Sequence, residues 1–177
     1  MKKIILYIAA SLDGRIAEPD GTVDFLSTYP VNEEMNYGYN DFMASVDTVL
    51  MGGRTYREIL NMDVIWPYKE QTTYVVTRGW TEKTNGGDVQ FITENVIETI
   101  SGLRDSEGKD IFLCGGGQLT AMLLQAGLVD EMRIFYVPVI LGKGIPLFPE
   151  QPTGTKWTMT GNHIYPNGVL GLTYQKL

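Results

Sequence analysis

Short apolar runs alternate with amphipathic stretches along most of the chain. Apolar runs that predict buried strands cover residues 3–10, 47–51, 73–77, 89–92 and 111–114. Apolar residues at helical spacing predict helices over residues 32–45, 55–61, 95–105 and 118–126. Because strands alternating with helices are typical of crossover units, this part of the chain predicts a parallel sheet.

The pattern changes near Glu131, after which no further helix is predicted. A long apolar strand is expected over 132–140, and two more over 157–164 and 169–174. The last two are separated by Pro166, Asn167 and Gly168, which is typical of a hairpin. We therefore predict a mixed α/β sheet with a mostly parallel core, antiparallel C-terminal strands and helices on both faces.

Length and charge narrow the class of protein. The chain has 177 residues, of which 44% are hydrophobic and 20% charged, and it contains no repeat or linker, so a single domain over 1–177 is expected. Its formal net charge of −7 opposes association with nucleic acid or anionic lipid, which need a surplus of Lys and Arg. A small-molecule ligand is the better hypothesis.

The counts of cysteine and histidine exclude some kinds of site. Cys114 and His163 are the single residues of their types, so neither an internal disulfide nor the usual His/Cys zinc site can form, and we predict no metal. The apolar run 4–10 is too short to span a membrane and ends at polar residues. A cytoplasmic protein is expected.

Two predicted strand-to-helix junctions, at 49–55 and 112–118, are rich in glycine. At the carboxyl edge of a parallel sheet such turns present free backbone N–H groups, and the missing Cβ atoms let a phosphate come close. The alternative is that the glycines only permit tight turns. Neither junction has the spacing of the Rossmann motif or of the P-loop.

Polar residues follow two neighbouring strands at the same expected edge. Arg54 and Thr55 come where the first glycine turn enters its helix, and Thr77 and Arg78 follow the next strand. Together they would hold a terminal phosphate, for which a ribose 2′-phosphate is suitable. The alternative is that both arginines are ordinary surface charges.

Four segments in order carry a resemblance that covers nearly the whole chain: residues 9–17, 51–56, 114–117 and 138–142. They resemble the dihydrofolate-reductase-like superfamily. The runs S-L-D-G-R-I-A and P-V-I-L-G are most similar to the C-terminal reductase domain of the bifunctional deaminase/reductase of riboflavin biosynthesis. The resemblance implies a dihydrofolate-reductase-like fold and NADPH as cofactor.

The resemblance also implies which positions contact the cofactor. They are Ala10, Ile16 and Ala17 beside the nicotinamide; Gly53, Arg54 and Thr55 at the adenosine-side phosphates; Thr77 and Arg78 around the adenine and 2′-phosphate; and Gly115, Gly116, Gly117 and Gln118 at the pyrophosphate.

The chain departs from this family where the substrate would bind. The riboflavin reductases carry a longer segment after the first strand, rich in Arg and Ser, that grips a ribose phosphate. Here residues 24–26 and 33–44 offer acids and aromatics instead. Dihydrofolate reductases use an acid on this helix, for which Glu33, Glu34 and Asp41 are available, but acids on amphipathic helices more often face solvent.

Asp13 is the candidate catalytic residue, because it follows the first strand at the edge where the nicotinamide is expected. The alternative is an aspartate that only shapes the turn before Gly14. His163 and Cys114 are interpreted as structural residues. Hydride transfer needs alignment of donor and acceptor and a proton source, which can be water.

The leading hypothesis is an NADPH-dependent oxidoreductase of the riboflavin-reductase-like type, which reduces a small heterocyclic or ribosylamino-pyrimidine substrate. The alternatives are a dihydrofolate reductase and a non-catalytic NADPH-binding protein. A homodimer is also predicted, because the apolar C-terminal strands over 132–140 and 157–174 would otherwise leave a long flat edge exposed.

Overall fold

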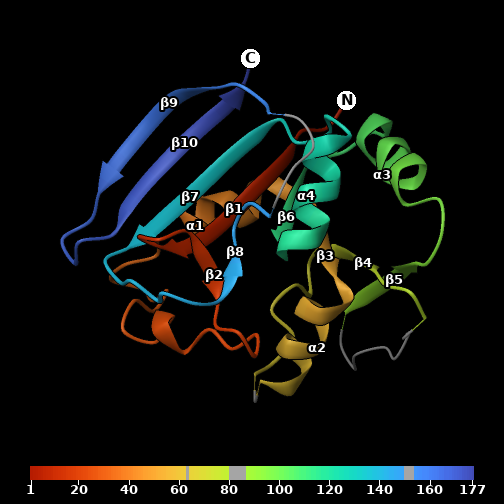
Figure 1. Ribbon diagram of the computed structural model, residues 1–177. Coiled ribbons are helices and arrows are strands. Elements are labelled where there is room, and N and C mark those ends of the chain that lie inside the picture. The colour runs from red at the N-terminus through yellow and green to blue at the C-terminus, as the bar shows by residue number, and fades with distance from the viewer. Residues whose placement is uncertain (63, 80–86, 150–153) are drawn as a thin grey trace.

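The computed structural model describes residues 1–62, 64–79, 87–149 and 154–177. An eight-stranded sheet runs through the molecule in the order β5-β4-β3-β6-β1-β7-β10-β9 (Figure 1). Its strands are β1 (Ile4–Ser11), β3 (Val46–Gly52), β4 (Thr72–Val76), β5 (Asp88–Ile92), β6 (Asp110–Gly115), β7 (Glu131–Val137), β9 (Trp157–Ile164) and β10 (Leu170–Lys176). Neighbours from β5 to β7 pair in parallel, and β10 pairs antiparallel with β7 and β9. The predicted mixed sheet is confirmed.

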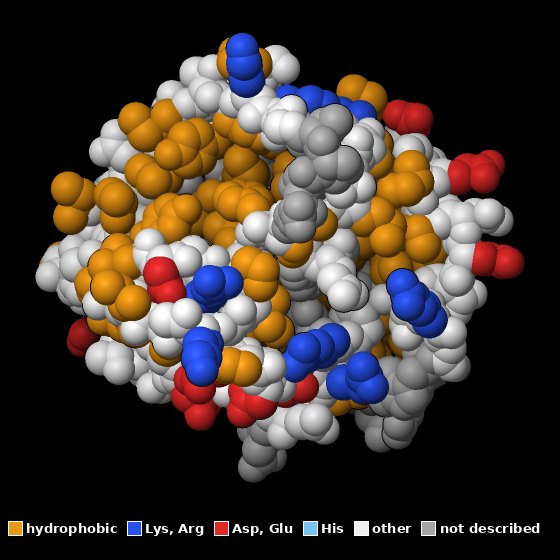
Figure 2. Space-filling model, in the orientation of Figure 1, with side chains coloured by type: hydrophobic (Ala, Val, Ile, Leu, Met, Phe, Trp, Pro, Cys, Tyr) orange, Lys and Arg blue, Asp and Glu red, His pale blue; other side chains and the backbone are white. Residues whose placement is uncertain are grey.

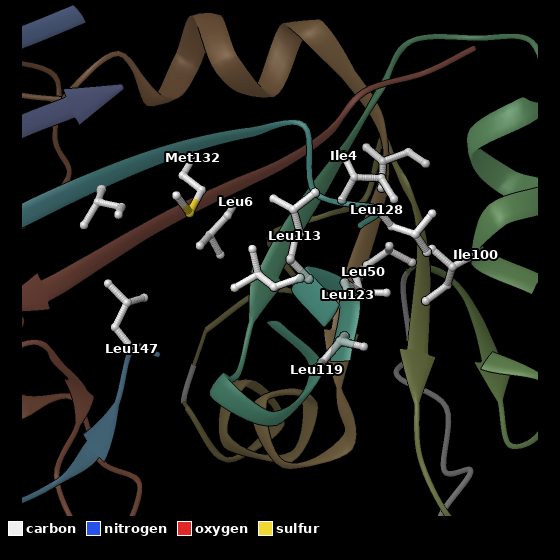
Figure 3. Packing of buried hydrophobic residues seen from close by; sticks show 14 of the residues in the cluster. Ile4, Leu6, Leu50, Ile100, Leu113, Leu119, Leu123, Leu128, Met132 and Leu147 are labelled. Carbon is white, nitrogen blue, oxygen red and sulfur yellow. The ribbon is translucent and has the colours of Figure 1, made fainter. Parts of the chain in front are cut away.

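Two helices cover each face of the sheet. They are α1 (Tyr39–Ser45) and α2 (Gly53–Asn61) on one face, and α3 (Val96–Asp105) and α4 (Gly117–Gln125) on the other. The alternation of β1 explains the two cores, since Ile4 and Leu6 pack with α3 and α4 while Ile5 packs with α1 and α2. Figure 3 shows Leu119 and Leu123 of α4 and Ile100 of α3 lying against the strand residues of the first core.

The helix predicted over 32–45 is wrong in its first half, because α1 begins only at Tyr39. The Asn32 side chain accepts hydrogen bonds from the backbone N–H groups of Glu34 and Met35, so it closes a local turn instead of a helix. Tyr37 and Gly38 then have φ values of 53° and 78°, which no right-handed helix contains. A short 3₁₀ turn, η1 (Asp24–Leu26), lies earlier in the same connection.

The strand predicted over 132–140 ends earlier, at Val137, because Pro138 has no N–H to donate to a ladder. The chain then passes the end of β1, where the Leu12 N–H donates a hydrogen bond to the Val139 carbonyl oxygen at 2.8 Å. Two short strands that the pattern did not predict, β2 (Arg15–Ala17) and β8 (Ile145–Pro146), pair antiparallel beside this point. They place the segment after β1 against the segment after β7.

Candidate functional site

The two glycine turns meet at the carboxyl edge of the sheet. β3 and β6 are neighbours, with Leu50 opposite Leu113 and Met51 opposite Gly115. A Cβ placed on Gly52 would lie 3.8 Å from the backbone nitrogen of Gly116. The turns that begin α2 and α4 therefore lie side by side, and both helix N-termini carry their free N–H groups to one place.

Threonine hydroxyls lie next to the glycines at this edge. A Cβ on Gly116 would be 3.3 Å from the Thr55 hydroxyl oxygen, and a Cβ on Gly53 would be 3.0 Å from the Thr77 hydroxyl oxygen. The missing side chains leave the backbone approachable between two hydroxyl groups. Backbone N–H donors, hydroxyls and a helix dipole are the groups that bind phosphate in proteins, so the predicted cradle fits a phosphorylated cofactor.

Gly117 has a further reason to be glycine. Its Cβ would lie 2.9 Å from the Pro146 carbonyl oxygen and 3.3 Å from Cγ of Pro149. The backbone of α4 thus touches the segment that contains β8, and any side chain at 117 would push them apart. The next residue, Gln118, is exposed. Pyrophosphate contacts by Gly117 and Gln118 stay predictions.

The structure places both arginines of the predicted basic corner at the surface, and binding of a 2′-phosphate there stays a prediction. Arg54 is exposed, and its Nη2 donates to the Asp20 carbonyl oxygen at 2.6 Å, beside Gly21 with its φ of 98°. Arg78 is also exposed, next to residues outside the described part of the chain. Lys and Arg side chains gather on the lower half of the face in Figure 2, in the region of β2, β8 and α2.

The residues predicted beside the nicotinamide come from β1 and β2. Ala10 is fully buried at the end of β1, and Ala17 is buried in β2 opposite Ile145 of β8. Ile16 is half-buried and packs against the core on the α4 face. Ala10 has almost no exposed surface, and contacts of these three side chains with a nicotinamide stay predictions.

Asp13 links the turn after β1 to the segment that follows β7. Its Oδ1 accepts from the Ser11 hydroxyl at 2.7 Å and from the Leu141 N–H at 3.0 Å, while Oδ2 accepts from the Gly142 N–H at 2.9 Å. These hydrogen bonds, that of Ser11 first, lower the pKa of Asp13 to about 2. The side chain is ionised at neutral pH, and its catalytic role stays a prediction.

Sequence reasoning did not find the role of Ser11 in this link. Its buried hydroxyl donates to Asp13 and accepts from the Arg15 N–H at 2.9 Å. A serine two residues before an aspartate and four before the next strand is the signal that could have indicated it. The P-V-I-L-G run, noted only for its resemblance, provides the backbone N–H groups.

The other acids considered for the substrate lie elsewhere. Glu33, Glu34 and Asp41 are all exposed, and only Asp41 belongs to α1. Burial raises the pKa of the Cys114 thiol, which lies 3.5 Å from the Tyr68 hydroxyl. His163 is exposed on β9 beside Tyr165, with 4.4 Å between the ring centres.

Across residues 1–62, 64–79, 87–149 and 154–177, no group of three or more His, Cys, Asp and Glu side chains could hold a metal ion. Within the same residues, none of the helices has the length and the apolar character that a membrane span needs.

Comparison with known proteins finds relatives in sequence and solved structures with the same fold. The protein YwjB of Bacillus subtilis, whose function is uncharacterized, is 36% identical over 168 residues that make up 95% of each chain. A putative riboflavin biosynthesis protein from Shewanella has the same fold, with a TM-score of 0.88, 29% identity and 99% of both chains covered. A deaminase and 5-amino-6-(5-phosphoribosylamino)uracil reductase from Thermotoga maritima shares the fold over 99% of this chain and 57% of its own, with a TM-score of 0.71 and 14% identity.

The family match extends over residues 2–170, which include the glycine turns, Asp13 and the segment after β7. The resemblance to the dihydrofolate-reductase-like superfamily, and within it to the riboflavin reductase branch, is confirmed. The chain belongs to the RibD C-terminal domain family.

Proposed function

We propose that the protein is an NADPH-dependent reductase that transfers a hydride to a small heterocyclic or ribosylamino-pyrimidine substrate. Membership of a reductase-like family of the riboflavin pathway supports the reaction class. The observation that carries the proposal is the meeting of two glycine turns between the hydroxyls of Thr55 and Thr77. We place the reaction in the cytoplasm.

Different residues of the chain would bind the phosphates and the nicotinamide of the cofactor. Gly116 and Gly53 keep the backbone open for phosphate oxygens, and Thr55 and Thr77 donate hydrogen bonds from either side. By the resemblance to the family, Ala10 and Ala17, near the ends of β1 and β2, would lie beside the nicotinamide. NADPH, when bound, supplies the hydride, and the protein contributes its alignment with the acceptor carbon.

The second candidate is a protein that binds NADPH without turning it over. It is favoured by the hydrogen bonds of Asp13, since the acid nearest the expected nicotinamide has both oxygens engaged and a pKa of about 2. Steady-state oxidation of NADPH with pyrimidine, pterin and other heterocyclic acceptors distinguishes the candidates. Turnover supports the reductase, whereas tight binding with none of the acceptors reduced supports the binder.

We expect NADPH to bind at least about tenfold more tightly than NADH. Each charge-assisted hydrogen bond from Arg54 or Arg78 to a 2′-phosphate contributes about 1.5–3 kcal/mol, and Arg54 keeps donors beyond the one that Asp20 accepts. Titration of Arg54→Ala and Arg78→Ala should show weaker NADPH binding with NADH almost unchanged. Lys156→Ala, which removes one exposed positive charge elsewhere, is the matched control. Equal affinities of the unmodified protein for NADPH and NADH would contradict the proposal that Arg54 and Arg78 bind the 2′-phosphate.

We also propose a homodimer in which the face of β7, β10 and β9 on the α4 side of the sheet packs against the same face of a second copy. Apolar side chains of these strands include Tyr136, Leu170, Leu172, Met159 and Ile164, and the last two are 52% and 75% exposed. Figure 2 shows a hydrophobic patch over these strands, and β9 is an edge strand with no Lys, Arg, Asp or Glu. In a chain of net charge −7, a largely apolar face suits a second copy of itself.

Light scattering should therefore give about twice the 19.8 kDa mass of one chain. Changing both Met159 and Ile164 to Asp should give a folded monomer, because the introduced carboxylates of the two copies would lie close together at the interface and repel each other. Ile140→Asp, at another exposed apolar side chain, should leave the dimer intact. A monomer at micromolar concentration of the unmodified protein would overturn the proposal.

A further inference from the structure

A hollow of about 290 Å³ lies on the α1 face of the sheet, over β7, β10 and β9. It is away from the glycine turns, and nothing in the proposed cofactor site uses it. Its lining comes from β1, β7, β9 and β10, from the turn before α1 and from the residue after β9. The aromatic and charged residues among these are Tyr7, Tyr37, Arg133, Phe135, His163 and Tyr165.

Two strand glycines line the hollow, and the Phe135 and Tyr165 rings lie directly over one of them, Gly171. Gly161 of β9 lies opposite Thr173, and Gly171 of β10 lies between Phe135 and His163. A Cβ on Gly161 would be 3.7 Å from Cβ of Thr173, an ordinary contact, so an alanine could be accommodated there without strain. Glycine at 161 is therefore not needed by the fold, and it keeps this space open.

The aromatic wall is fixed by hydrogen bonds and ring contacts. The Tyr7 hydroxyl donates to the Tyr37 carbonyl at 2.9 Å, and the Asn167 amide donates to the Tyr37 hydroxyl at 2.6 Å. The Tyr37 ring meets Tyr165 edge-on at 4.9 Å, and Phe135 lies 4.6 Å from Tyr7 between ring centres. Rings that already have their partners do not collapse into the hollow, and they are suited to contact with another flat ring.

Among the Lys, Arg, Asp and Glu side chains, the lining of the hollow contains only a cation, and its partner Glu131 lies outside the lining. Arg133 is its one Lys or Arg side chain, and none of its lining residues is Asp or Glu. The Arg133 Nε donates to the buried Glu131 at 2.7 Å, and its guanidinium lies over the Phe42 ring at 5.2 Å. Among the described residues, the two terminal nitrogens have no hydrogen-bond partner. Glu131 thus holds the guanidinium in place and leaves these donors for an anion.

We propose that this hollow is a binding site for a planar aromatic anion, with the ring against Tyr37, Phe135 and Tyr165 and the carboxylate or phosphate on Arg133. The size suits a ligand of one or two rings. The proposal does not depend on NADPH binding at the glycine turns. Such a ligand has two possible sources, the hydride acceptor itself or a separate effector.

The test uses benzoate as the probe and protein labelled with ¹⁵N at glycine. Benzoate should shift the amide signals of Gly161, Gly171 and Gly38 saturably, with a Kd of about 1 mM or lower. Benzamide lacks the charge and cyclohexanecarboxylate lacks the ring, so both should bind at least about tenfold more weakly. Equal shifts with all three compounds, or none with benzoate, would overturn the site.

Variants separate the hollow from general effects on the protein. Gly161→Ala adds a methyl group to the lining and should weaken benzoate binding several-fold, and Gly102→Ala, at an exposed helix position with nothing within 4 Å, should not. Arg133→Gln should abolish the preference for benzoate over benzamide. Because this change leaves Glu131 without its cation, the double variant Glu131→Gln with Arg133→Gln provides the same readout without a buried unpaired charge. Unaltered binding by Gly161→Ala and by the double variant would contradict the proposal.

The source of the ligand follows from the same variants. If the hollow holds the hydride acceptor, Gly161→Ala raises the KM of NADPH oxidation with that acceptor. If it holds an effector, turnover with saturating acceptor is unchanged while benzoate binding is weakened. The glycine signals respond without NADPH, so failure of the cofactor proposal cannot be mistaken for failure of this one.

Discussion

Changing Gly116 to valine is expected to abolish binding of both NADPH and NADH while the protein stays folded. The backbone of Gly116 is extended, with φ −79° and ψ −166°, so valine can adopt it. Its Cβ would stand 3.3 Å from the Thr55 hydroxyl oxygen, and its two methyl groups would fill the approach to the N–H groups that begin α4. Fluorescence titration of both cofactors, with circular dichroism of the thermal transition, measures the effect.

The control is Gly154→Val, at an exposed glycine whose Cβ would have no described residue within 4 Å. It changes the same atoms and should leave affinity and melting temperature as they are. A folded Gly116→Val protein that binds NADPH as tightly as the unmodified chain would contradict the proposal that the glycine turns bind the cofactor's phosphates. Gly116→Ala should be intermediate, since its single methyl group needs only a few tenths of an ångström from Thr55.

The parts of the fold that sequence predicts are those encoded by continuous patterns. β1, β3 and β6 are apolar runs, and α4 is a stretch with apolar residues at helical spacing, so neighbours in sequence carry the whole signal. The first half of the helix predicted at 32–45 fails because two residues with positive φ, Tyr37 and Gly38, interrupt a pattern that is otherwise helical. β2 and β8 have three and two residues, too few to show a period.

The candidate site divides in the same way. The glycine turns follow from the sequence, because each lies between a predicted strand and a predicted helix. The hydrogen bonds of Asp13 do not, since its backbone donor at Leu141 is 128 residues away. The aromatic hollow likewise draws Tyr7, Tyr37, Phe135 and Tyr165 from four separate segments, and no local pattern relates them.

Asp13→Asn is expected to lower turnover about 10²-fold or more with little change in NADPH affinity, if Asp13 orients the acceptor or takes part in proton transfer. The structure sharpens this test. Asparagine has one acceptor oxygen in place of two, so it can serve the Leu141 N–H or the Gly142 N–H but not both. A purely structural Asp13 therefore predicts loss of stability from this change as well, and turnover must be read beside the melting temperature.

A matched control is an aspartate that accepts a backbone hydrogen bond at the amino end of a strand, Asp110 at the start of β6. Asp110 accepts the Lys3 N–H at 2.8 Å, so Asp110→Asn weakens a comparable link far from the glycine turns and should leave turnover unchanged. Turnover of Asp13→Asn at the level of the unmodified protein, with an identified acceptor, would assign Asp13 to the turn alone.

The pH dependence separates proton transfer from positioning. A folded pKa of about 2 lies below the ordinary value, so the Asp13 carboxylate stabilises the fold above about pH 4, and this contribution is lost as the pH falls towards 2. Between pH 5 and 8 the group does not titrate, and positioning predicts that kcat of Asp13→Asn is lowered by the same factor at every pH. A limb of the kcat profile that is present in the unmodified protein and absent in Asp13→Asn would instead show that the substrate complex raises the pKa of Asp13. Without such a limb, Asp13 acts by holding the Leu141–Gly142 backbone beside the acceptor, and water is the proton donor.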